Sequence, residues 1–153
     1  MLRSLQGLVA TALILANPLA LAEEPAQEPA LAITAQDPKL NWGPCPSFIP
    51  QGCEIAVLHG DPGKANADVF FKVPPDFTIP EHWHTSPERM VLISGELQVT
   101  YDGQQPAVLK PGTYAYGPAK RPHKATCAKR DPCVLFIAFE GPVDAVPTAS
   151  PTN

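Results

Sequence analysis

The sequence predicts a single all-β domain, and three observations support this. Proline and glycine are frequent, with 20 and 10 residues among 153, and they recur too often for an uninterrupted helical stripe of useful length. Short apolar or alternating runs bounded by turn signals recur instead, which is the pattern of a β-sandwich or β-barrel. The length of 153 residues allows one domain with a modest core.

The first 22 residues have the features of a secretory signal peptide. Arg3 supplies the charged start, residues 8–15 the apolar centre, and Ala20-Leu21-Ala22 a cleavage site of small residues. An uncleaved membrane anchor is the alternative, although the apolar part is short for a membrane span. We therefore expect a periplasmic or secreted protein that has no membrane partner once residues 1–22 are removed.

Two further segments lie outside the expected fold. Residues 23–39 are rich in proline and alanine, without a firm apolar period, and are predicted to be a disordered linker. Residues 142–153 have the same character and are predicted to be a flexible tail, which leaves residues 40–141 as the folded unit. Removal of residues 1–22 takes away one arginine and no acid, so the formal net charge changes from −4 to −5. Nucleic acid is therefore not an expected partner.

Eight runs in the folded unit are expected to be strands. Asp102-Gly103 and Lys110-Pro111-Gly112 are turn signals between some of them, and the last run is the most continuously apolar. In chain order the expected strands are Glu54 to Leu58, Asp68 to Val73, Phe77 to His84, Arg89 to Ile93, Glu96 to Tyr101, Ala107 to Leu109, Thr113 to Tyr116 and Cys133 to Phe139.

The four cysteines predict two disulfides in an exported chain, and three pairings are possible. We favour Cys45 with Cys53 and Cys127 with Cys133, because each pair brackets a short segment rich in turn residues. The alternative is a cysteine metal site, which neither spacing supports because neither is C-x2-C.

The chemistry of the chain is concentrated in residues 81–95. His82 and His84 stand two residues apart, so in a strand both imidazoles point to the same face. Glu88 begins the next apolar run, after a bend at Thr85-Ser86-Pro87, and could turn its carboxylate to the same point. Two nitrogens and one oxygen make most of the coordination shell of a divalent metal.

His123 lies far along the chain, after a turn-rich stretch, and a β-barrel can bring it beside the other three residues. The fourth histidine, His59, is interpreted as an ordinary strand-end residue.

Two stretches resemble the two sequence motifs of the cupin superfamily. His82-Trp-His84-Thr-Ser-Pro-Glu88, followed after six residues by Gly95, is similar to the first motif. The series Gly112, Pro118 and His123 resembles the second, and the similarity covers about residues 66–140. The sequence departs from the motifs at Asp76 and Lys120, where glycines usually stand, and at Cys127, where an asparagine closes the second motif.

The resemblance implies a small cupin-type jelly-roll β-barrel with one divalent transition metal inside its open mouth. His82, His84, Glu88 and His123 would be the ligands. Mn, Zn, Cu, Fe and Ni all accept nitrogen and oxygen donors, and export favours Mn, Zn or Cu over labile ferrous iron. Glu88 is also the expected catalytic residue, because a carboxylate can loosen a metal bond and take up a proton. A hydrogen-bonded histidine cluster without metal is the alternative.

Two functions are compatible with such a site. The first is a metal-dependent, oxygenase-type enzyme that acts on a small organic molecule such as an enol, phenol or oxo-acid. The second is a non-enzymatic protein of the cell envelope that binds a metal or small ligand, as a sensor or scavenger. An acid, base or clamp that faces the metal would favour the enzyme, and the candidates are Arg89, Met90, Tyr114 and Tyr116.

Two further groups of residues suggest surfaces. A basic cluster beside His123 comprises Lys120, Arg121, Lys124, Lys129 and Arg130. It is interpreted as a solvated loop that protects a strand edge, with an anion-attracting gate as the alternative. Trp42 and Phe48 are expected to cover one barrel end or to form a dimer contact, and a homodimer is a possible assembly by resemblance.

Overall fold

The structure, a computed structural model, describes residues 27–148. Residues 27–31 belong to a separate unit from residues 32–153, and they contain no helix or strand. The predicted signal peptide, residues 1–22, lies outside the described residues, as do residues 149–153 of the predicted tail. The part of the chain that the structure describes has no helix long and apolar enough to cross a membrane.

Within residues 27–148 the structure consists of β-strands joined by turns and loops, without a helix, which confirms the all-β class. The strands are β1 Gly43–Pro44, β2 Glu54–His59, β3 Ala67–Val73, β4 Thr78–Trp83, β5 Glu88–Ser94, β6 Leu97–Tyr101, β7 Ala107–Leu109, β8 Tyr114–Gly117, β9 His123–Cys127, β10 Cys133–Phe139 and β11 Val146–Pro147.

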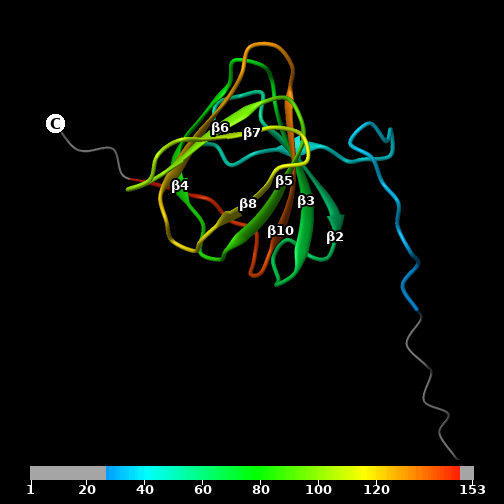
Figure 1. Cartoon of the computed structure of the whole chain (residues 1–153). Coiled ribbons are helices and arrows are strands. Elements are labelled where there is room, and N and C mark those ends of the chain that lie inside the picture. Colours follow the sequence, from blue (N-terminus) through cyan, green and yellow to red (C-terminus); the bar gives the residue numbers. More distant parts are fainter. Residues whose placement is uncertain (1–26, 149–153) are drawn as a thin grey trace, which may run out of the picture. The chain divides into compact units, whose positions relative to one another are not determined.

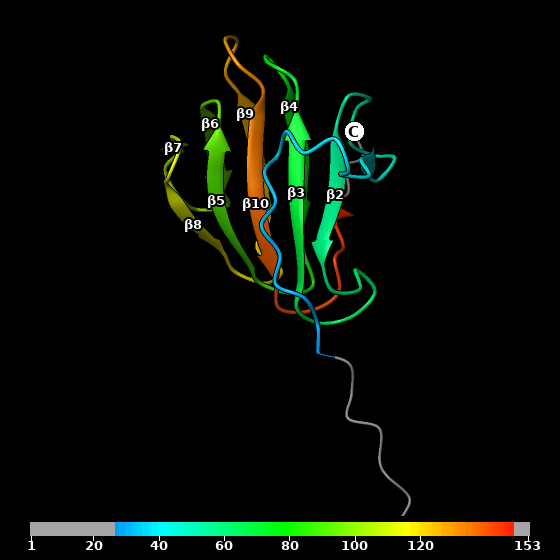
Figure 2. The ribbon, with the colours of Figure 1, turned by 90° about the vertical axis from the view of Figure 1, so that its right-hand side faces the viewer.

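The strands form two antiparallel sheets that face each other (Figure 1). One sheet has six strands in the order β1-β2-β3-β10-β5-β8, and the other has five in the order β11-β4-β9-β6-β7. Figure 2 looks onto the six-stranded sheet, with β5, β10, β3 and β2 side by side. No described strand of one sheet pairs through its backbone with a strand of the other. The architecture is therefore a two-sheet sandwich consistent with a jelly roll, rather than one continuously bonded barrel.

The apolar core lies between the two sheets, and strands such as β6 and β9 alternate buried and more exposed residues. In β9 the residues His123, Ala125 and Cys127 are buried, while Lys124 and Thr126 are exposed. The five-stranded sheet thus turns one residue in two toward the core, and His123 belongs to that inward set.

Both predicted disulfides are present, and they account for all four cysteines. Cys45 and Cys53 have their Cα atoms 5.5 Å apart and close the loop before β2. Cys127 and Cys133, with Cα atoms 5.9 Å apart, join the end of β9 to the start of β10 and so connect the two sheets.

Residues 143–148, which the sequence assigned to a flexible tail, are ordered against the five-stranded sheet. Val146 pairs with Trp83 and Pro147 with His82 across β11 and β4. The N–H of Thr148 donates to the carbonyl of Glu81 at 3.2 Å. Proline is tolerated here because β11 is an edge strand. This pairing brings residues 146–148 beside the end of β4 that holds His82.

Candidate metal centre

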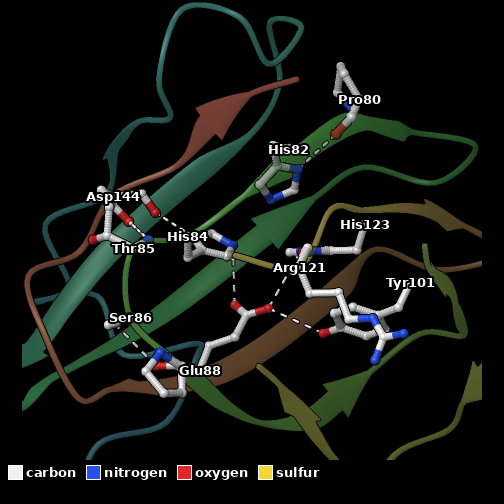
Figure 3. Close-up of polar contacts among 11 residues, drawn as sticks. Pro80, His82, His84, Thr85, Ser86, Glu88, Tyr101, Arg121, His123 and Asp144 are labelled. Atoms are coloured by element: carbon white, nitrogen blue, oxygen red, sulfur yellow. Dashed lines mark hydrogen bonds and ion pairs between the residues drawn. The ribbon is translucent and has the colours of Figure 1, made fainter. Parts of the chain in front are cut away.

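The four residues expected to bind a metal come from three strands that meet at one end of the sandwich. His82 lies near the end of β4, and His84 follows directly after that strand. Glu88 is the first residue of β5, and His123 is the first of β9. His82 and His123 are register partners across β4 and β9. The structure therefore brings together all four predicted residues, and Figure 3 shows their side chains turned toward one another.

The side chains of this cluster are close enough to bind a single metal ion together. His82, His84 and His123 each offer one ring nitrogen, and these atoms all lie within 4.8 Å of one another. The Glu88 carboxylate is 3.5 Å from Nε2 of His84 through one oxygen and 3.5 Å from Nε2 of His123 through the other. All four side chains are buried, with exposed fractions between 3% and 8%.

Backbone carbonyls fix the protonation of each imidazole. The Nδ1–H of His82 donates to the carbonyl of Pro80 at 2.7 Å, and that of His123 donates to Arg121 at 3.2 Å. The Nδ1–H of His84 donates to the carbonyl of Asp144. A carbonyl can only accept, so Nδ1 must be the protonated nitrogen in each ring. Each neutral ring then keeps a lone pair on Nε2, the atom that two of the rings turn toward Glu88.

Burial keeps His82 and His123 neutral. Desolvation lowers the pKa of His82 from 6.5 to about 4, although the Pro80 carbonyl acts in the opposite direction. Desolvation, reinforced by the charge of His82, lowers the pKa of His123 to about 3. Neutral imidazole is the form that binds metal, so the low pKa values favour ligation across the neutral range.

Glu88 is held by a tyrosine and a glycine that sequence reasoning did not single out. The hydroxyl of Tyr101 donates to Oε1 of Glu88 at 3.4 Å. A Cβ at Gly117 would lie 2.6 Å from both this Glu88 oxygen and the Tyr101 hydroxyl oxygen, so only glycine leaves room for the pair. Burial raises the pKa of Glu88, and the neighbouring His84 opposes this. Tyr101 also pairs in register with His123.

The segment after β10 also contributes to the centre. Asp144 accepts from His84 through its backbone carbonyl and from the N–H of Thr85 through Oδ1, at 2.9 Å. The same residue thus orients His84 and anchors the bend between β4 and β5. A backbone carbonyl has no residue-specific signal, which explains why the sequence did not indicate this contact.

A cavity of about 110 Å³ extends from the cluster into the space between the sheets. Met90 lines it, because it lies two residues after Glu88 on the same face of β5. Arg89 instead pairs with Glu140 at 2.6 Å, and Tyr114 and Tyr116 are 61% and 51% exposed on β8. Arg89, Tyr114 and Tyr116 therefore do not supply an acid, base or clamp that faces the metal centre. The tyrosine that faces the cluster is Tyr101.

Among the remaining predicted surface residues, the side chain of Phe48 lies against the metal centre. Phe48 packs with its ring centroid 5.8 Å from that of His82, so it covers one side of the centre. Trp42 lies elsewhere, with Nζ of Lys72 4.1 Å from its ring centroid. None of the five residues of the basic cluster lines the cavity. Within the described residues, that cluster therefore gives no support to an anion-attracting gate.

Comparisons with known proteins agree on the fold. A family model described as ChrR Cupin-like domain matches residues 31–144. No curated protein matches the sequence. Several solved structures resemble this one, but their sequence identities are low, so the similarity shows a shared fold only. The lyase DddQ from Ruegeria pomeroyi DSS-3, described as a DMSP lyase, is 21% identical with a TM-score of 0.62. That match covers 74% of this chain and 64% of the lyase chain.

Two other solved structures show the range of proteins with this fold. The polyketide cyclase RemF from Streptomyces resistomycificus is 16% identical with a TM-score of 0.61, and the match covers 78% of this chain and 87% of the cyclase. An oxalate oxidase is 18% identical with a TM-score of 0.56, and the match covers 68% of this chain and 59% of the oxidase. The chain spans less than two thirds of the lyase and oxidase chains.

Proposed function

The chain belongs to the ChrR cupin-like family, and on this premise we propose that it is an exported metal-dependent enzyme, of oxygenase type, acting on a small organic molecule. The proposal has three parts, which are metal binding, turnover and export. Each has its own support and its own test.

One observation carries the metal-binding part. The three Nδ1–H groups of the histidine cluster donate to backbone carbonyls, so three Nε2 lone pairs remain inside a buried site. Lone pairs cannot satisfy one another, and the single proton that Glu88 could carry would serve only one of them. A divalent cation would satisfy all of them at once, and this is why the metal-free histidine cluster is the weaker reading.

His82, His84 and His123 would hold the ion, with Glu88 as the fourth ligand. A bound divalent ion would supply a Lewis acid or a redox centre at the Nε2 atoms. Nitrogen and oxygen donors of this kind accept Mn, Zn, Cu, Fe or Ni, and the donor set alone does not choose among them.

Glu88 and Tyr101 support the enzyme part. Burial raises the pKa of the Glu88 carboxyl, and a carboxylate with a raised pKa is better suited to accept a proton near neutral pH. The Tyr101 hydroxyl, 3.4 Å from Oε1 of Glu88, orients that carboxylate. Enzymes are also frequent among proteins with this fold, as the lyase, the cyclase and the oxidase show.

Elemental analysis of protein purified from the exported fraction tests the metal site. We expect one transition metal ion per chain in the natural protein, and none in His84→Ala. The matched control is His59→Ala, since His59 is exposed and lies outside the cluster. Equal metal content in all three proteins would refute the site.

Oxygen uptake with candidate enols and phenols then tests turnover. We expect uptake by the metal-loaded protein, a loss of about tenfold or more in Tyr101→Phe, and no change in Tyr114→Phe. Full metal content without any turnover would support the second candidate function, a non-enzymatic metal or small-ligand binding protein of the envelope. The observation that favours this candidate is that Arg89, Tyr114 and Tyr116 do not line the cavity.

The cellular context is part of the same proposal. Two disulfides fit an oxidising compartment and so support cleavage after residue 22 and a periplasmic or secreted protein. A small-molecule partner, the absence of nucleic-acid and membrane partners, and a homodimer complete it. The linker at 23–39 and the start of the fold at residue 40 are also proposals, while the pairing of β11 with β4 extends the folded part beyond the expected limit at residue 141. N-terminal sequencing and sedimentation of the exported protein test the processing and the assembly state.

A further inference from the structure

We infer that the ligand of this site is a small molecule whose polar atoms lie at one end and whose remaining body is apolar and uncharged, as in an alkyl-substituted phenol or enol. The inference rests on the proposed function, because the polar end would meet the metal centre. It goes further in specifying the chemistry of the rest of the ligand.

The walls of the cavity are apolar away from the metal centre. Among the described residues that line the cavity, none is lysine or arginine. Most lining side chains are aliphatic or aromatic hydrocarbons. Those with a polar or ionisable side chain are His82, His84, Glu88, Tyr101, His123 and Asp144. Four of these form the buried cluster described above, Tyr101 contacts it through Glu88, and Asp144 lies directly beside it.

These polar groups have no spare hydrogen for a ligand. The three Nδ1–H groups donate to backbone carbonyls, and the Tyr101 hydroxyl donates to Glu88. The Asp144 carboxylate is an acceptor, and Oδ1 already receives the Thr85 N–H. A second carboxylate on the ligand, placed away from the metal, would therefore lose its water without gaining a donor, and a hydroxyl beyond the reach of Asp144 would likewise find no side-chain partner, which is unfavourable.

The five-stranded sheet shows where the apolar body would lie. Ala125 follows His123 by two residues on β9, so both side chains face the cavity about 7 Å apart along the strand. Ala125 is flanked in register by Ile79 on β4 and Val99 on β6. Because the alanine side chain is small, it leaves space between Ile79 and Val99 for an apolar group of the ligand. This space lies at about one ring length from the metal centre.

The mouth of the cavity points to the same ligand class. Most lining residues are buried, and the partly exposed ones mark the entrance: Cys45, Pro46, Ile55, Phe71, Val143, Asp144 and Ala145. They come from the Cys45–Cys53 loop, from β2 and β3, and from the segment before β11. The only charge among them is negative, so the entrance has no cation to attract an anionic ligand.

A matched series of phenols tests the inference by calorimetric titration of the metal-loaded, full-length protein. The series is phenol, 4-ethylphenol, 4-(hydroxymethyl)phenol and 4-hydroxybenzoate, with oxalate as a ligand that is polar at both ends. We expect 4-ethylphenol to bind about tenfold more tightly than phenol. The hydroxymethyl and carboxylate analogues, which keep the ring and add a polar atom at the far end, should bind at least tenfold more weakly than 4-ethylphenol.

Ala125→Leu locates the effect within the cavity. This variant should remove most of the advantage of 4-ethylphenol over phenol, because the added side chain occupies the space beside Ile79 and Val99. Thr126→Leu is the control, since it adds bulk on the same strand but on the exposed face, and it should leave the series unchanged. Thermal unfolding shows whether each variant folds; if Ala125→Leu does not, the series on the natural protein decides.

The outcomes separate this inference from the proposed function. If the protein takes up no metal but still prefers 4-ethylphenol, the inference about the apolar cavity stands and the proposed function is refuted. A metal-loaded protein that binds oxalate or 4-hydroxybenzoate at least as tightly as 4-ethylphenol overturns the inference and leaves metal binding intact.

Discussion

The imidazole of His84 donates its Nδ1–H to the backbone carbonyl of Asp144, a residue 60 positions further along the chain. The Oδ1 atom of the same aspartate accepts from the N–H of Thr85. The side chain of Asp144 thus holds in place the carbonyl that orients the His84 ring, one of the proposed metal ligands. Contacts of this kind fix the tautomer and the direction of a ligand, and their loss commonly lowers metal affinity by 10- to 100-fold.

The first prediction concerns Asp144→Ala. Removal of the carboxylate frees the Thr85 N–H and loosens the segment that carries the carbonyl, so we expect metal affinity to fall about tenfold. Competition with a chromophoric chelator measures it. Asp131→Ala is the control, because it removes the same charge from an exposed residue and should leave affinity unchanged. Equal affinities in the two variants would show that the carboxylate does not support the site.

The second prediction concerns the space beside Glu88. A Cβ at Gly117 would lie 2.6 Å from the Glu88 carboxylate and from the Tyr101 hydroxyl, so Gly117→Ala must displace one of them. We expect a loss of about 1–3 kcal/mol in the free energy of unfolding together with weaker metal binding. Gly43→Ala is the control, since its nearest neighbour atom would be 3.9 Å away. Urea unfolding and metal analysis of both variants check this, and a fully stable, metal-replete Gly117→Ala would contradict it.

The third prediction is a pH dependence of the metal-free protein. Burial lowers the pKa of His82 to about 4 and that of His123 to about 3, below the ordinary 6.5. Between these values the unfolded chain binds protons that the folded protein excludes, so stability present above pH 6.5 is lost as the pH falls. The raised pKa of Glu88 acts in the opposite sense, since its contribution is lost as the pH rises. Two histidines oppose one carboxyl, so we expect the free energy of unfolding to fall as the pH falls from 6 to 5.

Urea unfolding of chelator-treated protein from pH 5 to pH 7.5 measures this slope. His123→Gln should reduce it, because one of the two proton-excluding rings is gone. A protein that becomes more stable as the pH falls through this range would show that the carboxyl, rather than the histidines, dominates.

The parts of the site that could be predicted from the sequence are those with a local signal. His82 and His84 share a face because side chains alternate along a strand, and the order of the run placed Glu88 at its start. His123 required the resemblance to a known motif, because its position depends on the pairing of β4 with β9, which join distant residues. Its strand was not among the eight expected runs, since it is short and interrupted by charge.

The parts that could not be predicted depend on backbone atoms or on register. Asp144 orients His84 through a carbonyl that any residue would have. Strand β11 consists of two residues, one of them proline, so it has no apolar period to detect. Tyr101 is an intermediate case. Its parity with Leu97 and Val99 indicates an inward side chain, but only the pairing with His123 places it beside Glu88.

The last prediction concerns the positions where the chain departs from the cupin motifs. Asp76 and Lys120 stand where the motifs have glycine, and both have φ of 60°, so the left-handed backbone is kept without the glycine. At Lys120 this turn lets the N–H donate to the carbonyl of His84 at 2.7 Å. Lys120→Gly should change the free energy of unfolding by less than about 0.5 kcal/mol, because relief of backbone strain offsets the greater freedom of the unfolded chain.

Lys120→Val should instead destabilise the protein by about 1 kcal/mol or more, since a β-branched side chain is strongly disfavoured at positive φ. Lys124→Val is the matched control, because Lys124 is exposed in the middle of β9, where valine is well accommodated. Urea unfolding compares the three variants. Equal stability of the two valine variants would mean that the turn relaxes at no cost, and the close contact between Lys120 and the backbone of His84 would then not constrain the histidine.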